Sequence, residues 1–125
     1  MCGIVGLYLK NPELESRIGE LFKPMLIAMT DRGPDSAGFA IYGDEVGEGW
    51  VKLTLRHPDA DYDWEALATR LKTELQLELS WFQNASVAVF KVHAEEATLR
   101  EWLSEEAADV LILSVGQSIE ILKEV

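Results

Sequence analysis

Cys2 is the residue best suited to chemistry, because it is the single cysteine of the 125-residue chain and directly follows the initiator methionine. Aminopeptidases usually remove a methionine that precedes a small residue, so we expect the mature chain to begin at Cys2. An N-terminal cysteine carries a thiol and a free α-amine on one residue, and the amine can accept the proton of the thiol. Cys2 is therefore a candidate nucleophile, although a lone cysteine is also often a small buried apolar side chain.

A second candidate lies about 30 residues later, in the segment TDRGPDSAG of residues 30–38. This segment is rich in turn-forming residues and is predicted to be a loop. Arg32, next to Gly33, could bind a carboxylate or a carbonyl through its rigid fork of donors. Asp35 and Ser36 are expected to shape the loop through side-chain to backbone hydrogen bonds. Near Cys2, Gly3 is expected to leave the backbone uncrowded for a substrate.

These two motifs, Met1-Cys2-Gly3-Ile4-Val5-Gly6 and the later Asp31-Arg32-Gly33-Pro34-Asp35-Ser36-Ala37-Gly38, resemble the class II glutamine amidotransferases. That family consists of N-terminal nucleophile hydrolases, and the stretch MLIAMTDRGPDSAGFAIYG is most similar to stand-alone amidotransferase subunits related to glutamate synthase. The resemblance covers the N-terminal portion of the chain. It implies that Cys2 is the catalytic residue, with Arg32, Gly33 and Gly3 supporting the active site.

The reaction implied by the resemblance is attack of the Cys2 thiolate on the side-chain amide of the substrate glutamine. A glutamyl thioester would form with loss of ammonia, and water would then release glutamate. The ammonia would pass to a synthase partner. No cofactor is implied, and His57 and His93 are too few to suggest a metal site.

Two further motifs of the family are missing from the sequence. Members usually contain a Gly-His-Thr-Arg segment that binds the substrate carboxylate and an Asn-Gly pair that builds the oxyanion hole. Lys91-Val92-His93-Ala94 and Asn84-Ala85 match neither motif. The chain is thus expected to be a fragment that lacks a C-terminal segment, one chain of a split enzyme, or a non-catalytic relative. We favour the fragment and predict little or no glutaminase activity for this chain alone.

Composition excludes several other classes of protein. The net charge of −11 argues against nucleic acid or an anionic membrane as a partner, because both reward clustered positive charge. No apolar run is long enough to span a bilayer, and no secretory signal is recognisable. A single cysteine excludes an intrachain disulfide. These features predict a cytoplasmic globular protein.

The hydrophobic pattern predicts an α+β fold. We expect a buried strand at 3–9, a helix that begins at Asn11 and Pro12 and breaks near Lys23 because of Pro24, and a strand at 39–42. The helix carries one apolar stripe, formed by Leu14, Ile18, Leu21, Phe22, Met25, Leu26 and Met29. Later elements are predicted as a strand with one solvent-exposed face at 51–55, a helix capped by Asp63 at 64–75, a strand at 86–92, a helix at 95–106, and strands at 110–115 and 119–122.

The predicted order of elements divides the chain into two parts. Residues 1–46 form a β-α-loop-β unit, which the resemblance makes the front of an αββα sandwich of the N-terminal nucleophile type. Residues 47–125 form a β-α-β-α-β-β lobe, with helices on one face of a small sheet. The alternative function is a non-catalytic interaction or regulatory module of a larger synthase complex, in which residues 50–125 bind the partner and Cys2 is an ordinary strand residue.

Overall fold

The computed structural model describes residues 2–124, which fall into two compact units. The N-terminal unit comprises residues 2–37 together with residue 124, and the core unit comprises residues 38–123. The mixed α+β class is confirmed, since helices and two sheets are present. The αββα sandwich and the domain division between residues 46 and 47 stay predictions.

The N-terminal unit is built around one helix. Local sequence signals mark the start of the turn that leads into it. A 3-10 turn, η1 (Pro12–Arg17), leads into α1 (Ile18–Ala28), and a second short turn, η2 (Thr30–Arg32), follows. Asn11 caps the first turn as predicted, because its side-chain oxygen accepts a hydrogen bond from the amide of Glu13 at 3.0 Å. No residue of 2–37 is buried.

The predicted break near Lys23 is wrong, because α1 runs without interruption through Pro24. The change of helix type comes earlier, between Arg17 and Ile18. Pro24 and Glu20 are both exposed, so water can hydrate the Glu20 carbonyl that lacks an amide partner. A solvent-exposed helix therefore tolerates this proline.

The buried strand predicted at residues 3–9 is also wrong. The segment has no regular secondary structure, and within the described part of the chain it pairs with no strand. It nevertheless alternates: Val5, Leu7 and Leu9 are half-buried, whereas Ile4 and Tyr8 are 94% and 84% exposed. The apolar run predicts a buried strand, but a strand also requires a hydrogen-bonding neighbour, and residues 3–9 have none among the described residues.

The core unit contains a four-stranded antiparallel sheet with the order β3-β4-β2-β5. The chain order is β-α-β-β-α-β, which with this strand order is the ferredoxin-like arrangement. The elements are β2 (Trp50–Arg56), α2 (Trp64–Leu75), β3 (Leu79–Asn84), β4 (Val87–His93), α3 (Glu96–Glu106) and β5 (Leu111–Gly116). Asp63 caps α2 as predicted, accepting a hydrogen bond from the amide of Ala66 at 3.0 Å.

The predicted β-α-β-α-β-β order is wrong, because it omits β3. Its residues LSWFQN lack β-branched side chains, and only Trp81 and Phe82 are of types enriched in strands, so propensity alone gives a limited signal. The alternation of Leu79, buried, and Trp81, half-buried, with exposed neighbours was the available indication. The strand pairs without irregularity with β4 from Leu79 opposite Val92 to Asn84 opposite Val87.

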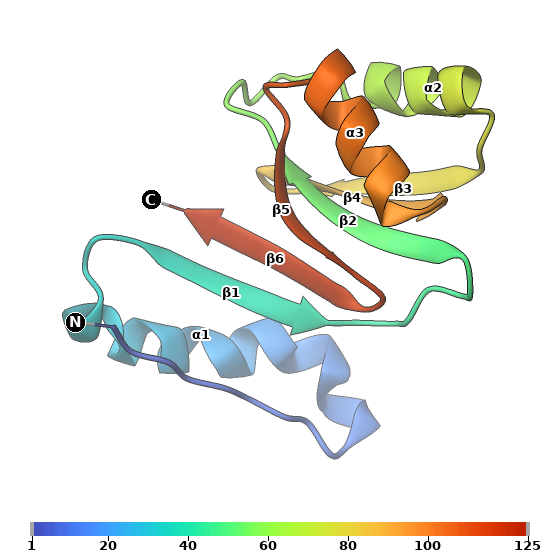
Figure 1. Cartoon of the computed structure of the whole chain (residues 1–125). Helices are drawn as coiled ribbons and strands as arrows, with labels where there is room; N and C mark the ends of the chain where they lie inside the picture. The colour runs from blue at the N-terminus through green and yellow to red at the C-terminus, as the bar shows by residue number, and fades with distance from the viewer. Residues whose placement is uncertain (1, 125) are drawn as a thin grey trace. The chain divides into compact units, whose positions relative to one another are not determined.

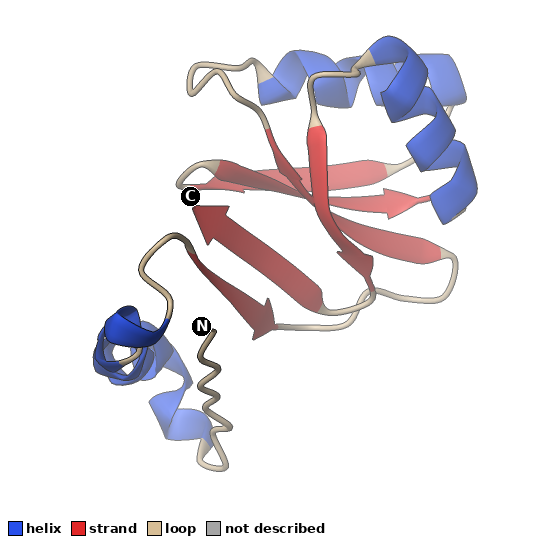
Figure 2. Cartoon of the chain, turned by 60° about the vertical axis from the view of Figure 1, so that its left-hand side comes forward, coloured by secondary structure: helices blue, strands red, loops and turns tan. Residues whose placement is uncertain are grey.

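Both helices of the core unit cover one face of the sheet, as predicted (Figure 2). Leu53 and Leu55 of β2 point into this layer and are fully buried. The apolar core on this side includes Leu67 and Leu71 of α2, Leu99 and Leu103 of α3, and Ala88, Phe90 and Val92 of β4. Burial of these side chains is the main stabilising contribution to the unit.

The opposite face of β2 was predicted to be exposed to solvent, and this is wrong. Lys52 is 1% exposed and Thr54 is fully buried. The strands β1 (Ala37–Tyr42) and β6 (Ile119–Glu124) form a separate two-stranded sheet (Figure 1). The amide of Ile121 in β6 donates to the Thr54 hydroxyl at 3.4 Å, so β6 lies over this face of β2.

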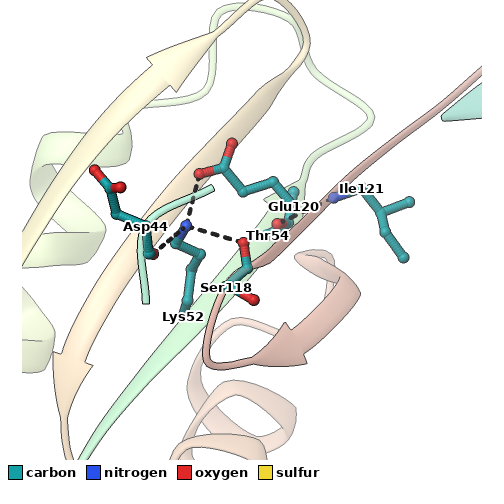
Figure 3. Close-up of polar contacts among 6 residues, drawn as sticks. All are labelled: Asp44, Lys52, Thr54, Ser118, Glu120 and Ile121. Carbon is teal, nitrogen blue, oxygen red and sulfur yellow. Dashed lines mark hydrogen bonds and ion pairs between the residues drawn. The ribbon is translucent and has the colours of Figure 1, made fainter. Parts of the chain in front are cut away.

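The Lys52 ammonium group is fully satisfied despite its burial (Figure 3). It donates to the backbone carbonyls of Asp44 and Ser118 at 3.3 and 3.2 Å and to Glu120 Oε1 at 2.9 Å. Three N–H donors thus meet three acceptors, which is the condition for burying a charged amine. The ammonium links β2, β6 and the loop that begins at Gly43.

We expect Glu120→Ala to lower the free energy of unfolding by about 3 kcal/mol, because it leaves the Lys52 charge buried without its anion. Lys52→Met should cost less, since Glu120 is 21% exposed and can be hydrated. Urea unfolding followed by tryptophan fluorescence measures both, because all four tryptophans lie in the core unit.

Arg100→Ala is the matched control, since it removes a surface ion pair with Glu96 and should cost less than about 1 kcal/mol. The double variant Lys52→Met/Glu120→Leu should regain most of the lost stability. A loss for Glu120→Ala no larger than that for Arg100→Ala would contradict this account of the buried pair.

Tyr62 lies in a partly desolvated aromatic cluster at the start of α2. Its ring stacks on His57 with centroids 3.9 Å apart and meets the edge of Trp64 at 4.9 Å. Burial raises the pKa of Tyr62 above its ordinary value, and the charges of Asp109 and Asp63 add to this, while that of Arg70 opposes it. The folded state therefore favours the neutral phenol.

Because the folded pKa of Tyr62 is raised, its contribution to stability is complete below the unfolded pKa of about 10 and is lost as the pH rises through the folded value. We expect Tyr62→Phe to make the free energy of unfolding fall less steeply as the pH rises above about 10. Tyr42→Phe, which changes an exposed tyrosine of the core unit, is the control. Equal alkaline slopes for wild type and Tyr62→Phe would refute the prediction.

Candidate active site

Cys2 presents a free thiol at the protein surface. It opens the extended segment that precedes η1 and is exposed. The interpretation of Cys2 as a buried apolar residue is therefore wrong, and the thiol is accessible to a substrate. Exposure is a requirement of a nucleophile, although it does not by itself make one.

Arg32 is held by a short hydrogen-bonded turn that follows α1. Its amide donates to the Met29 carbonyl at 3.0 Å, and the amide of Gly33 donates to the Thr30 carbonyl at 3.2 Å. The Thr30 hydroxyl donates back to the Ile27 carbonyl at 2.7 Å, which ties the turn to the helix end. The predicted loop at 30–38 thus begins with a defined 3-10 turn, and β1 takes its last two residues.

The Arg32 side chain is exposed and available for a ligand. Among the described residues, no hydrogen bond or ion pair engages its guanidinium group. By contrast, Arg17 in the same unit donates to both carboxylate oxygens of Glu20. A guanidinium without an internal partner retains its full set of donors for a carboxylate or carbonyl.

Gly3 brings the cysteine segment against the turn that carries Arg32. A methyl group added at Gly3 would overlap the terminal methyl of Met29 and lie 3.1 Å from Cβ of Arg32 and 3.4 Å from its Cδ. The space beside Gly3 is therefore filled by protein, and the uncrowded backbone expected there is found at Gly6, which has nothing within 4 Å. The residue after Cys2 thus packs directly on Arg32.

Two segments were compared with the missing family motifs, Lys91-Val92-His93-Ala94 and Asn84-Ala85. Both lie in the core unit. Val92, in Lys91-Val92-His93-Ala94, is fully buried in the core on β4. Asn84-Ala85 lies in the β3–β4 hairpin, where Ala85 adopts a positive φ of 53°.

The core unit also has two surface cavities of about 300 Å³ each, one beside His57 and Trp64 and one between α3 and β5. Neither Cys2 nor Arg32 lines them. Within residues 2–124, no three His, Cys, Asp or Glu side chains cluster in a way that could hold a metal ion. No helix in this range is both long and apolar enough to cross a bilayer.

Comparison with known proteins finds similarity to two proteins whose names refer to glutamine amidotransferases. Over its whole length, an alignment of 126 residues, the chain is 43% identical to the glutamine amidotransferase-like protein GlxB of Rhizobium meliloti (strain 1021). Over 43 residues, 34% of this chain, it is 56% identical to a protein of Methanothermobacter thermautotrophicus that is provisionally named a glutamine amidotransferase. No family model and no solved structure matches the chain.

The chain spans only part of these relatives, namely 41% of the length of the first and 14% of the length of the second. The similarity is therefore to parts of two proteins that carry these names, and membership of the glutamine amidotransferases stays a prediction for this chain. The N-terminal nucleophile class and the relation to glutamate synthase stay predictions. So do the roles of Cys2, Arg32, Gly33 and Gly3.

We expect Gly3→Ala to displace Met29 and Arg32, because the added methyl would occupy the space of the Met29 methyl. The NMR resonance of the Met29 methyl group should shift clearly in this variant. Gly6→Ala is the matched control, since its added methyl would enter open space. Equal shifts in the two variants would show that Gly3 does not pack on Met29.

Proposed function

We propose that this chain is the nucleophile-bearing part of a class II glutamine amidotransferase of the N-terminal nucleophile type, related to the stand-alone subunits that accompany glutamate-synthase-like partners. Its substrate is glutamine, and the ammonia it releases passes to a synthase. We place the protein in the cytoplasm, where a reducing environment keeps a catalytic thiol free.

The chemistry begins when removal of Met1 frees the α-amine of Cys2. The amine accepts the thiol proton, and the thiolate sulfur bonds to the amide carbon of the glutamine side chain. The C–N bond then breaks, the nitrogen takes up the proton and leaves as ammonia, and a glutamyl thioester remains. Water attacks the thioester, which regenerates the thiol and releases glutamate.

Arg32 supports this reaction by placing a positive charge beside the cysteine, in a turn that Gly33 completes. Gly3 allows the close approach of the two segments. Groups that bind the substrate carboxylate and stabilise the oxyanion come from further protein, either a C-terminal segment or a partner subunit. An oxyanion donor often contributes around 3–4 kcal/mol to the reaction, so this chain alone has little or no glutaminase activity.

The observation that carries the proposal is the contact of Gly3 with Arg32. Two segments separated by almost 30 residues in sequence meet at the residue that follows the candidate nucleophile. The exposure of the Cys2 thiol and the identity with GlxB along the whole chain add independent support. The proposal gives Gly3 and Arg32 a role in supporting Cys2.

Ammonia and glutamate release from L-glutamine tests the proposal, measured on the protein made from the complete coding sequence and on residues 1–125 alone. We expect turnover by the former only. Cys2→Ala should reduce kcat at least about 10³-fold, since loss of the nucleophile removes the covalent route. Arg17→Ala, which removes an exposed arginine paired with Glu20, should leave turnover unchanged. Full turnover by Cys2→Ala would overturn the proposal.

A second candidate function is a non-catalytic interaction module. It is favoured by the packing of the protein, because the described buried core lies in the ferredoxin-like unit and neither cavity there contains Cys2. In that case the complete protein should bind its synthase partner and release no ammonia. Partner binding that survives Cys2→Ala while glutamine turnover disappears would support the enzymatic function instead.

A further inference from the structure

Met29 contacts both segments of the candidate active site. Its backbone carbonyl accepts the hydrogen bond from the Arg32 amide at 3.0 Å, which closes the turn. Its side chain reaches the other segment, where the terminal methyl occupies the space beside Gly3. One residue therefore holds Arg32 through its main chain and meets the neighbour of Cys2 through its side chain.

Met29 lies at the end of α1, and the helix fixes the position of its backbone. Its amide donates to the Leu26 carbonyl at 3.1 Å, so the backbone of Met29 continues the hydrogen bonding of the helix. The side chain is half-buried, between the helix end and the extended segment. Its length and volume then determine how closely residue 3 can approach the turn. In the sequence, Met29 stands out only as one member of the apolar stripe of the helix.

We propose that Met29 is a positioning residue that sets the separation of the Cys2 thiol and the Arg32 guanidinium. The inference rests on the proposed function, in which that separation matters. A guanidinium close to a thiolate stabilises the negative charge, and the Coulomb energy depends directly on the distance between the groups. Met29 does not touch the substrate and acts through the placement of the other two residues.

The reactivity of Cys2 tests this inference without requiring turnover. Because Cys2 is the single cysteine, alkylation of the chain by iodoacetamide, followed by mass spectrometry, reports on that thiol alone. At pH 7 and low salt we expect Arg32→Ala to slow alkylation about fivefold. Met29→Ala should slow it by a comparable factor, because the segments lose their spacing. Met29→Leu has a similar volume and should retain most of the wild-type rate.

Salt dependence separates positioning from simple loss of structure. Added salt screens an exposed pair of charges, so the wild-type rate should fall toward that of Arg32→Ala as salt rises. Met29→Ala should respond weakly to salt, and Met29→Leu should respond like the wild type. Far-UV circular dichroism checks that α1 is intact. If Met29→Ala loses the helix, Gly3→Ala decides, because it disturbs the same contact without changing α1.

The outcomes distinguish this inference from the function on which it rests. If Arg32→Ala slows alkylation while Met29→Ala keeps the wild-type rate and salt response, Met29 does not position the pair and the inference is overturned. If Arg32→Ala is alkylated at the wild-type rate, Arg32 does not support Cys2, and that part of the proposed function is contradicted. A reduced rate in Met29→Ala that Met29→Leu restores supports the inference.

Discussion

The buried ammonium of Lys52 is the interaction that organises the second face of the core sheet. A charged amine with 1% exposure requires an acceptor for each of its protons, and the three acceptors come from two distant parts of the chain. Meeting that requirement holds β6 and the residue 44 loop against β2. The sheet thus carries an apolar helical layer on one face and, on the other, a polar contact in which the Lys52 ammonium group is fully satisfied.

The N-terminal unit is held together differently, and the candidate chemistry lies there. None of its described residues is buried, so its order depends on hydrogen bonds at the end of α1 and on contacts such as that of Gly3 with Met29. Functional sites are often found in the less stable parts of a fold. The two units thus differ in what stabilises them: buried apolar side chains in the core unit, and hydrogen bonds and surface contacts in the N-terminal unit.

Much of the fold could be predicted from local signals. The apolar stripes and the cap at Asp63 placed α2 and α3 correctly, and the cap at Asn11 marked the turn η1 that leads into α1, because a helix pairs residues only four positions apart. Strands were less certain, since each depends on a neighbour distant in sequence. Residues 3–9 have the pattern of a strand without a partner, whereas β3 has a partner and only a weak pattern.

The sequence by itself determined the types of reactive group: a thiol in Cys2, next to the first residue, and an arginine in a glycine-rich turn. Only the tertiary structure decided that Gly3 packs on Arg32 and Met29, and that Lys52 and Thr54 are buried. The reason is physical: a residue's chemistry is local, whereas its neighbours and its exposure depend on which distant segments fold against it.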